Sequence, residues 1–383
     1  MAAVKYRASP HIVAYWQDGR LIVHHFASGV LLTADPVVLQ ILHVCRSWRG
    51  MGEIVRQLTA LPAPVVEAAV DALSQASFLR RSDRHLANKE AAYDSWNGWN
   101  PAAGFFHSAT RGVRWPTPLE NAKLNRALVK KARAARVPPP LKQYRGASRV
   151  TLPPARGHGE FASVLVARRT WRTFSRRALP LDDLGTLLGL TAGVQMWGVS
   201  SAGHVRVPFT TSPSAGSKHP LELYVAARRV SGLSPGVYHY AADRHQLERV
   251  AAAVSSRQLE RLLGGQWYFK NAAAVVFMTA VWARTQWTYS YARAYRSVLA
   301  EAGHVCQTFC LVATWLNLAP FCTMALADAE IEKVLVIDGV TEAVLYAAGV
   351  GMKPTGGRWT QWPEQEARRQ SDPGQKRRSP ARR

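Results

Sequence analysis

The chain has 383 residues, of which 48% are hydrophobic and 19% charged, a composition typical of a globular protein and not of a disordered one. Its formal net charge of +24 at pH 7 would suit nucleic acid, an anionic membrane surface or an acidic peptide. No segment resembles a zinc finger or another nucleic-acid module, so we expect no nucleic-acid partner and interpret most of the charge as solvated surface.

Residues 1–82 predict a small N-terminal module of the winged-helix type. Residues 12–33 alternate apolar and polar in short runs around Asp18-Gly19, as a β-hairpin does. Asp35 is the expected N-cap of the first helix, and Pro64 takes a first-turn position of the third. Helices are expected over 37–48, 51–60 and 65–79. The third helix is acidic and apolar, which suits a DNA groove poorly, so the module favours peptide binding through an added strand.

Residues 83–158 are predicted to connect this module to the rest of the chain. The aromatic-rich stretch 96–115 is expected to pack on the main domain. Residues 122–150 contain nine Lys or Arg and no acidic residue, and the helical pattern of 125–137 ends at a run of three prolines. At the other end of the chain, residues 363–383 form a basic tail without apolar periodicity, which predicts disorder.

Residues 159–362 show the mixed helix and strand pattern of an α+β domain. Helices are expected over 161–169, 178–194 and 291–318, and strands over 221–230, 236–242, 272–282 and 343–351. The long helix carries apolar residues close to the 3.6-residue period at Tyr295, Val298, Leu299, Ala302 and Val305.

The four cysteines do not make a disulfide scaffold in a chain of this length. Cys306 and Cys310 share one helix face and are interpreted as buried thiols, so we expect no metal site. The longest apolar run, residues 272–283, is too short to span a bilayer, and the N-terminus has no apolar signal core. These features predict a cytoplasmic protein without membrane insertion.

Three polar clusters could carry chemistry, although each alone has an ordinary structural interpretation. Residues 168–172 contain three arginines, whose guanidinium groups suit a phosphate, but such a cluster is often a solvated face. Residues 213–216 form a turn of small residues with a serine hydroxyl and accessible backbone N–H groups. Residues 349–353 end a predicted strand in glycines and a lysine, which can close over a phosphate or simply form a strand exit.

Residues 160–355 resemble a known family. The segments that carry the resemblance are, in chain order, RRTWRTF, PSAGSKHPLELYV, PGVYHYAADRHQLE, EAGHVCQ and LYAAGVGMKP. The resemblance is to nitroreductase-like flavoproteins, specifically the SagB/ThcOx type of FMN-dependent oxidase from peptide natural-product pathways. It implies an α+β, nitroreductase-like three-layer fold with a central antiparallel-rich sheet, and a homodimer with FMN at its interface. It also implies azoline-to-azole dehydrogenation of a precursor peptide, as in bacteriocin maturation, together with cyclodehydratase-type partner enzymes.

The resemblance also implies roles for single residues. Arg168 and Lys353 would contact the FMN phosphate, Arg172 would face the N1/O2 edge of the isoalloxazine, and the turn at Ser214 would lie against the flavin. His304 is expected to be a buried structural hydrogen-bonder. The cofactor-binding residues implied in this way are Arg168, Arg169, Thr170, Arg172, Pro213, Ser214, Ala215, Gly216, Gln307, Gly349, Gly351 and Lys353.

One departure from the family concerns the catalytic base. Azoline-oxidising members place a Lys-Tyr pair at positions that correspond here to Tyr289 and Ser290, so the lysine is missing. Tyr289 and Tyr291 are the candidates that remain, and Asn317 stands where glycine is common. The departures leave two alternatives open: an NAD(P)H-dependent reductase of quinones or nitro compounds with the same fold, or a non-catalytic scaffold of a peptide-processing complex.

Overall fold

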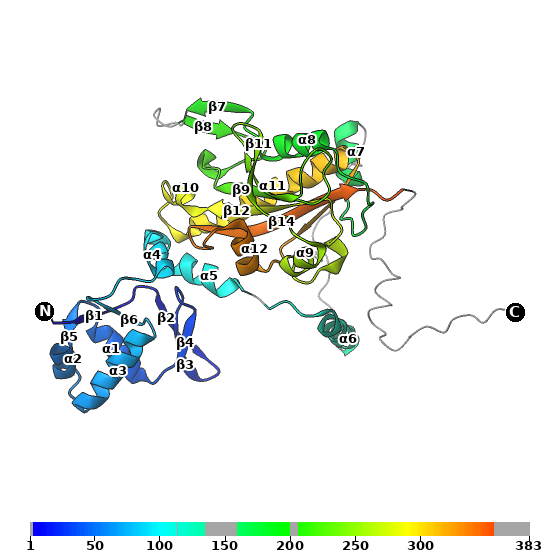
Figure 1. Ribbon diagram of the computed structural model, residues 1–383. Helices are drawn as coiled ribbons and strands as arrows, with labels where there is room; N and C mark the ends of the chain where they lie inside the picture. Colours follow the sequence, from blue (N-terminus) through cyan, green and yellow to red (C-terminus); the bar gives the residue numbers. More distant parts are fainter. Residues whose placement is uncertain (1–2, 113, 135–158, 200–205, 356–383) are drawn as a thin grey trace, which may run out of the picture.

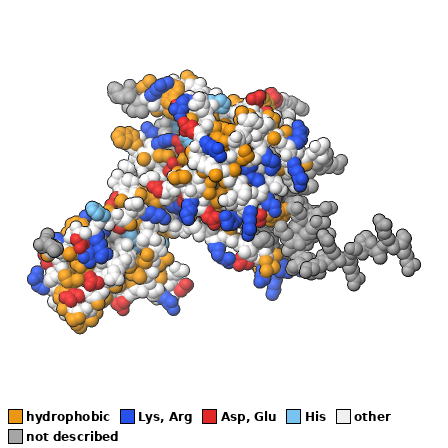
Figure 2. Space-filling view, viewed as in Figure 1, with side chains coloured by type: hydrophobic (Ala, Val, Ile, Leu, Met, Phe, Trp, Pro, Cys, Tyr) orange, Lys and Arg blue, Asp and Glu red, His pale blue; other side chains and the backbone are white. Residues whose placement is uncertain are grey.

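The computed structural model describes residues 3–112, 114–134, 159–199 and 206–355, which form an N-terminal unit, a connecting segment and a larger sheet domain (Figure 1). The predicted connector beyond residue 134 and the predicted tail 363–383 lie outside the described residues. No helix among the described residues is both long and apolar enough to cross a membrane. Basic side chains are spread over the visible face of the sheet domain (Figure 2).

The N-terminal unit has its own hydrophobic core. Its elements are β1 (Lys5–Ala8), β2 (Ile12–Gln17), β3 (Arg20–His25), β4 (Val30–Thr33), α1 (Pro36–Val44), β5 (Arg49–Gly50), α2 (Met51–Gln57), α3 (Ala63–Gln75) and β6 (Leu79–Arg81). The predicted hairpin is confirmed as β2 and β3, joined by Asp18 and Gly19 at φ 51° and 73°, the left-handed conformation that two-residue hairpin turns need. Asp35 caps α1 as predicted, because its carboxylate accepts the Val37 N–H at 2.9 Å.

The connecting segment joins the N-terminal unit to the sheet domain through aromatic packing. It contains α4 (Asn88–Asp94), the 3-10 turn η1 (Asn97–Trp99), α5 (Ala102–Thr110) and α6 (Pro118–Ala134). Trp96 and Trp99 are fully buried beside Trp282 and Tyr295 of the sheet domain, whose rings stack at 4.9 Å. The predicted packing of the aromatic-rich stretch on the main domain is therefore confirmed.

A polar cluster also ties α4 to the N-terminal unit. The Glu90 carboxylate accepts hydrogen bonds from Arg80 at 2.7 Å and from Ser9 at 2.8 Å, and His25 lies 3.8 Å from it. Burial alone would raise the pKa of Glu90, but the contacts with His25, Arg80 and Ser9 lower it to about 2. Glu90 is therefore ionised at neutral pH and stabilises this junction.

The sheet domain is built on six antiparallel strands in the order β11-β10-β9-β12-β14-β13. Its strands are β7 (Met196–Val199), β8 (Arg206–Phe209), β9 (Leu221–Ala227), β10 (Gly236–Ala241), β11 (Gln246–Ala251), β12 (Ala274–Val281), β13 (Leu318–Thr323) and β14 (Glu342–Met352), of which β7 and β8 form a separate hairpin. Its helices are α7 (Glu160–Ala167), α8 (Leu181–Ala192), α9 (Ser256–Leu262), α10 (Trp282–Gln286), α11 (Tyr295–Trp315) and α12 (Asp328–Leu335), with 3-10 turns η2 (Ala215–Ser217), η3 (Trp267–Phe269) and η4 (Ala292–Ala294).

Helices cover both faces of this sheet, so the domain has three layers (Figure 1). One core places Leu184 and Leu188 of α8 and Phe309 of α11 on one face of the sheet. The other core places Leu259 of α9 and Ile331 of α12 on the opposite face. The predicted α+β fold with a central antiparallel sheet is confirmed.

The end of α11 explains an unusual residue in the sequence. Asn317 follows the C-cap of the helix with φ 57°, a left-handed position that favours glycine and tolerates asparagine. Its backbone therefore adopts the conformation that a glycine would give, and its side chain adds an amide at the end of the sheet.

Candidate active site

The arginine cluster lies at the end of the sheet, next to β13 and β14. The N–H of Trp171 donates to the Pro320 carbonyl at 2.8 Å, and the N–H of Ser175 donates to the Met352 carbonyl at 2.9 Å. These bonds hold residues 168–175 against the two strands. Arg168 is the C-cap residue of α7 and is half-buried. The guanidinium of Arg172 lies 5.7 Å from the centre of the Tyr268 ring.

Lys353 joins this cluster from the end of β14. Its ammonium donates to Asn317 Oδ1 at 2.7 Å and lies 5.5 Å from the centre of the Trp171 ring. Burial lowers the pKa of Lys353. We call Arg168, Trp171, Asn317 and Lys353 the cation cluster. Among the described residues no carboxylate pairs with Arg168 or Lys353, so the cluster is suited to an anion.

The two glycines before Lys353 have a packing role in this chain. A Cβ atom at Gly349 would lie 2.2 Å from Phe321 Cε1, and one at Gly351 would lie 2.8 Å from Phe174 Cδ1. Both positions are buried within β14. The space that a side chain would need is thus occupied by aromatic rings.

The turn at residues 213–216 lies elsewhere, against the N-terminal half of α11. Ser214 Oγ donates to Glu301 Oε2 at 2.7 Å and accepts the N–H of His219 at 2.8 Å. Gly216 has φ 60°, and a Cβ atom there would lie 2.3 Å from the Tyr289 hydroxyl. Glycine is therefore required at this position by its conformation and by the close approach of Tyr289.

Tyr289 and Tyr291 differ in their surroundings. The backbone carbonyl of Tyr289 accepts the indole N–H of Trp99 at 2.8 Å, so the connecting segment holds this tyrosine in place. Tyr291 is more exposed, and the two rings lie 6.0 Å apart. Of the two, Tyr289 is the one whose hydroxyl reaches the turn.

The predicted burial of His304 is wrong. Its side chain is exposed on α11 and makes a long hydrogen bond of 3.4 Å with the Pro213 carbonyl. Gln307 is exposed one turn further along the same helix. The surface of α11 between the turn and the cation cluster is consequently open.

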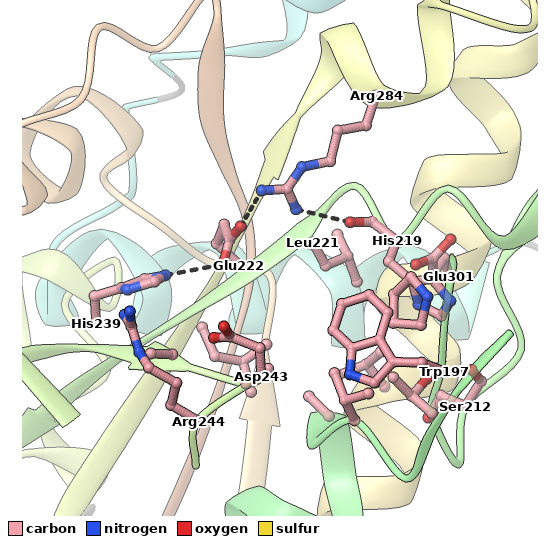
Figure 3. Close-up of a pocket in the computed structure, with 18 residues that line it drawn as sticks. Trp197, Ser212, His219, Leu221, Glu222, His239, Asp243, Arg244, Arg284 and Glu301 are labelled. Carbon is pink, nitrogen blue, oxygen red and sulfur yellow. Dashed lines mark hydrogen bonds and ion pairs between the residues drawn. The ribbon is translucent and has the colours of Figure 1, made fainter. Parts of the chain in front are cut away.

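Glu301, the first residue of the EAGHVCQ segment, is a buried carboxyl group to which the resemblance assigned no role. Its exposed fraction is 4%, and burial raises its pKa to about 7 against the opposing effects of the Ser214 and Ala215 hydrogen bonds. It lines a cavity of about 290 Å³ between the β7–β8 hairpin, β9, β10 and α11 (Figure 3). Other residues that line the cavity include Trp197, Ser212, His219, Glu222 and Arg284.

Glu222 organises the charges of this cavity. It accepts a hydrogen bond from Arg284 and lies 2.9 Å from His239 Nε2 (Figure 3). His239 Nδ1 lies 3.0 Å from Glu248. The contact with Glu222, with a further one from Glu248, raises the pKa of His239 to about 9 despite burial. His239 is therefore a cation at neutral pH. Strand positions 222 and 239 gave no sequence signal beyond a polar residue in an apolar run.

The predicted site residues thus form two sets. The helix α11 separates the turn, which contacts Glu301, from the cation cluster near Trp315. At 1.5 Å rise per residue these ends of the helix are about 20 Å apart. The structure brings Lys353 against Trp171, three residues after Arg168, and brings the Tyr289 hydroxyl to Gly216 of the turn.

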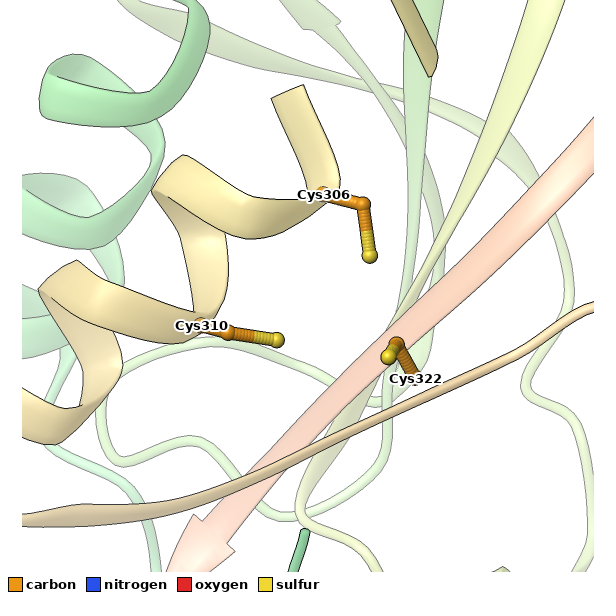
Figure 4. Close-up of side chains that lie close together, drawn as sticks. All are labelled: Cys306, Cys310 and Cys322. Atoms are coloured by element: carbon orange, nitrogen blue, oxygen red, sulfur yellow. The ribbon is translucent and has the colours of Figure 1, made fainter. Parts of the chain in front are cut away.

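A third thiol joins Cys306 and Cys310. Cys322 of β13 lies beside them, and the three sulfur atoms are all within 4.8 Å of one another (Figure 4). Hydrogen bonds from Cys306 and Cys310, with a smaller effect of Arg168, lower the pKa of Cys322. No other His, Cys, Asp or Glu among the described residues completes the group, which belongs to the hydrophobic core.

Comparisons with known proteins match the sheet domain. Residues 165–352 match the model of the nitroreductase family. A protein of Methanocaldococcus jannaschii assigned to the nitroreductases is 34% identical over 174 residues, which are 45% of this chain and 83% of that protein. The trifolitoxin-processing protein of Rhizobium leguminosarum bv. trifolii is 28% identical over 179 residues, 44% of this chain and 46% of that protein.

Two solved structures are similar to part of this chain. A nitroreductase-like protein of Anabaena variabilis is 28% identical with a TM-score of 0.43, over 51% of this chain and 38% of that one. A chain of the Escherichia coli microcin synthetase complex, solved with a truncated pro-microcin bound, is 20% identical with a TM-score of 0.44, over 63% of this chain and 95% of that one.

Proposed function

Because this chain belongs to the nitroreductase family of flavin-dependent oxidoreductases, we propose that it is an FMN-dependent dehydrogenase acting on a ribosomally made precursor peptide. The main observation behind the proposal is that one chain contains both the family's domain and an N-terminal unit with its own hydrophobic core. The similarity to a trifolitoxin-processing protein supports a peptide substrate. Since the chain spans less than half of that relative, its substrate and partners are part of the proposal.

The cation cluster fits the phosphate of FMN. Arg168 and Lys353 are half-buried, and an anion would offset the desolvation of both groups. We assign the phosphate to these two residues and the N1/O2 edge of the isoalloxazine to Arg172, with Arg169, Thr170 and Gln307 lining the same site. When bound, FMN would accept two electrons from the substrate and pass them to oxygen.

A second copy of the chain would complete the site. Pro213, Ser214, Ala215 and Gly216 are proposed to form the flavin wall, yet they lie about 20 Å from the cation cluster along α11. The exposed face of α11 that carries Gln307 lies between the two sets. Burial of this face against a symmetric copy would enclose a cofactor between them, which supports a homodimer.

Exposed apolar side chains supply a surface for that dimer. Phe161 of α7 is 71% exposed, and Met196 and Val199 of the β7–β8 hairpin are 62% and 63% exposed. Hydrophobic side chains gather over this hairpin at the top of the molecule (Figure 2). An apolar patch such as the one over this hairpin is typical of an interface.

Tyr289 is the proposed proton carrier. Conversion of an azoline to an azole removes a hydride and a proton from the ring, so a proton acceptor must lie beside the cofactor. The hydroxyl of Tyr289 reaches Gly216 of the proposed wall, with Tyr291 next to it. The N-terminal unit would bind the peptide's leader segment, and a cyclodehydratase-type partner would make the azoline.

Mass analysis of a cyclised precursor peptide tests this function. With FMN and oxygen, the purified protein should remove two hydrogens per azoline ring, Tyr289→Phe should slow the reaction, and Arg172→Leu should abolish it. Rapid reduction of the bound flavin by NADPH without peptide would instead indicate an NAD(P)H-dependent reductase, the alternative that the missing lysine favours. Full product formation by Arg172→Leu in the complete peptide-processing complex, together with loss of product when residues 1–82 are deleted, would indicate the scaffold.

A further inference from the structure

Glu301 accepts a hydrogen bond from Ser214, the residue that supplies a hydroxyl to the proposed flavin wall. It lies in the second turn of α11, and its carboxylate accepts the Ser214 hydroxyl at 2.7 Å. The Ser214 oxygen in turn accepts the His219 N–H at 2.8 Å. A hydroxyl has one hydrogen, and in this state the hydrogen of Ser214 is directed to Glu301.

No positive charge among the described residues pairs with Glu301. The titratable groups that share its cavity are His219, Glu222, His239, Asp243, Arg244 and Arg284. Both Arg284 and His239 pair with Glu222, and Arg244 pairs with Glu248. Burial lowers the pKa of His219, which favours its neutral form.

The groups on the other sides of Glu301 do not supply a charge either. His304, three residues along α11, is exposed and turned to the Pro213 carbonyl, and the Tyr289 hydroxyl approaches Gly216. Lys218 follows the turn and makes no ion pair among the described residues. An ionised Glu301 is therefore buried without a compensating charge among the described residues, and the hydrogen bonds from Ser214 and Ala215 only partly oppose the burial that raises its pKa to about 7.

Protonation reverses the hydrogen bond between the two side chains. A neutral Glu301 can donate its own O–H to Ser214 Oγ, whose second lone pair still accepts the His219 N–H. The Ser214 hydrogen is then available to a ligand on the far side of the turn.

We propose that Glu301 is a positioning residue of the flavin site, which takes up a proton when a ligand with a hydrogen-bond acceptor, such as the flavin ring, binds against Ser214. The proton releases the Ser214 hydroxyl to donate to that ligand. This inference rests on the proposed function, because it takes residues 213–216 as the wall of the flavin site.

FMN titrations followed by flavin fluorescence at pH 6, 7 and 8 test the inference. If binding requires neutral Glu301, wild-type affinity falls about tenfold between pH 6 and pH 8. Glu301→Gln keeps an amide donor beside Ser214 permanently, so its affinity at pH 8 should stay near the wild-type value at pH 6. The FMN phosphate titrates in both proteins and cancels in their comparison.

Calorimetry in two buffers of different ionisation enthalpy measures the proton directly. Wild type should take up a proton on binding FMN at pH 7.5. The control variant Glu330→Gln, which replaces an exposed carboxylate on α12, should do the same. Glu301→Gln and Ser214→Ala, which removes only the hydroxyl, should not. Proton uptake that persists in both variants would overturn the inference. If wild type itself binds no FMN at any pH, the proposed function has failed before this question arises.

Discussion

Replacement of Lys353 by methionine should weaken FMN binding without weakening riboflavin binding. One of the three ammonium donors bonds to Asn317 at 2.7 Å, and burial already lowers the lysine pKa, so two donors and a desolvated charge remain for an anion. Hydrogen bonds between charged groups contribute about 1.5 to 3 kcal/mol. The dissociation constant of FMN should therefore rise about 10- to 150-fold.

Quenching of flavin fluorescence measures this change for both ligands. Riboflavin lacks the phosphate, so its affinity should be the same for wild type and Lys353→Met. Lys333→Met, on the exposed side of α12, is the matched control and should leave both affinities unchanged. An unchanged FMN affinity in Lys353→Met, or an equal loss for FMN and riboflavin, would refute the assignment of the phosphate to the cation cluster.

Three further predictions concern the fold. Gly349→Ala should lower the free energy of unfolding by about 1 to 3 kcal/mol in urea, since the new Cβ overlaps Phe321, whereas Gly303→Ala, with nothing within 4 Å, should raise it slightly; equal effects would contradict the packing role. Because the pKa of Glu90 is lowered to about 2, its ionised form stabilises the protein above about pH 4.5, and this contribution disappears as the pH falls towards 2. Glu90→Gln should therefore lower the free energy of unfolding at pH 7, and the difference from wild type should shrink below pH 3. A difference that does not change with pH would show that charge is not the cause. A thiol reagent should react slowly with the native protein and with four thiols per chain after unfolding, because none of the cysteines is in a disulfide; fewer than four would contradict this.

The fold could be read largely from local patterns. The 3.6-residue period placed α11 to within a few residues of Tyr295–Trp315, and the alternation around Asp18 placed the first hairpin. These elements are specified by which residues are apolar and by turn chemistry, both of which are local properties. The β7–β8 hairpin escaped prediction because its exposed Met196 and Val199 break the usual alternation.

The site was harder to predict because its geometry comes from distant segments. Glu301 is buried by a turn 87 positions away in the sequence, and Cys322 reaches Cys306 and Cys310 only because β13 lies beside α11. The strand-exit pattern placed Lys353 at the end of β14, where it contacts Trp171, but no local pattern indicated that Gly349 faces Phe321. The sequence shows which residues are polar, whereas tertiary packing determines which of them are buried.

The visible absorption spectrum of the purified protein, taken with and without added FMN, tests the central claim most directly. The account predicts flavin absorption bands that remain after gel filtration, with one FMN per chain and elution as a dimer, because each site would use residues of both copies. A protein that stays colourless after incubation with excess FMN and elutes as a monomer would contradict it.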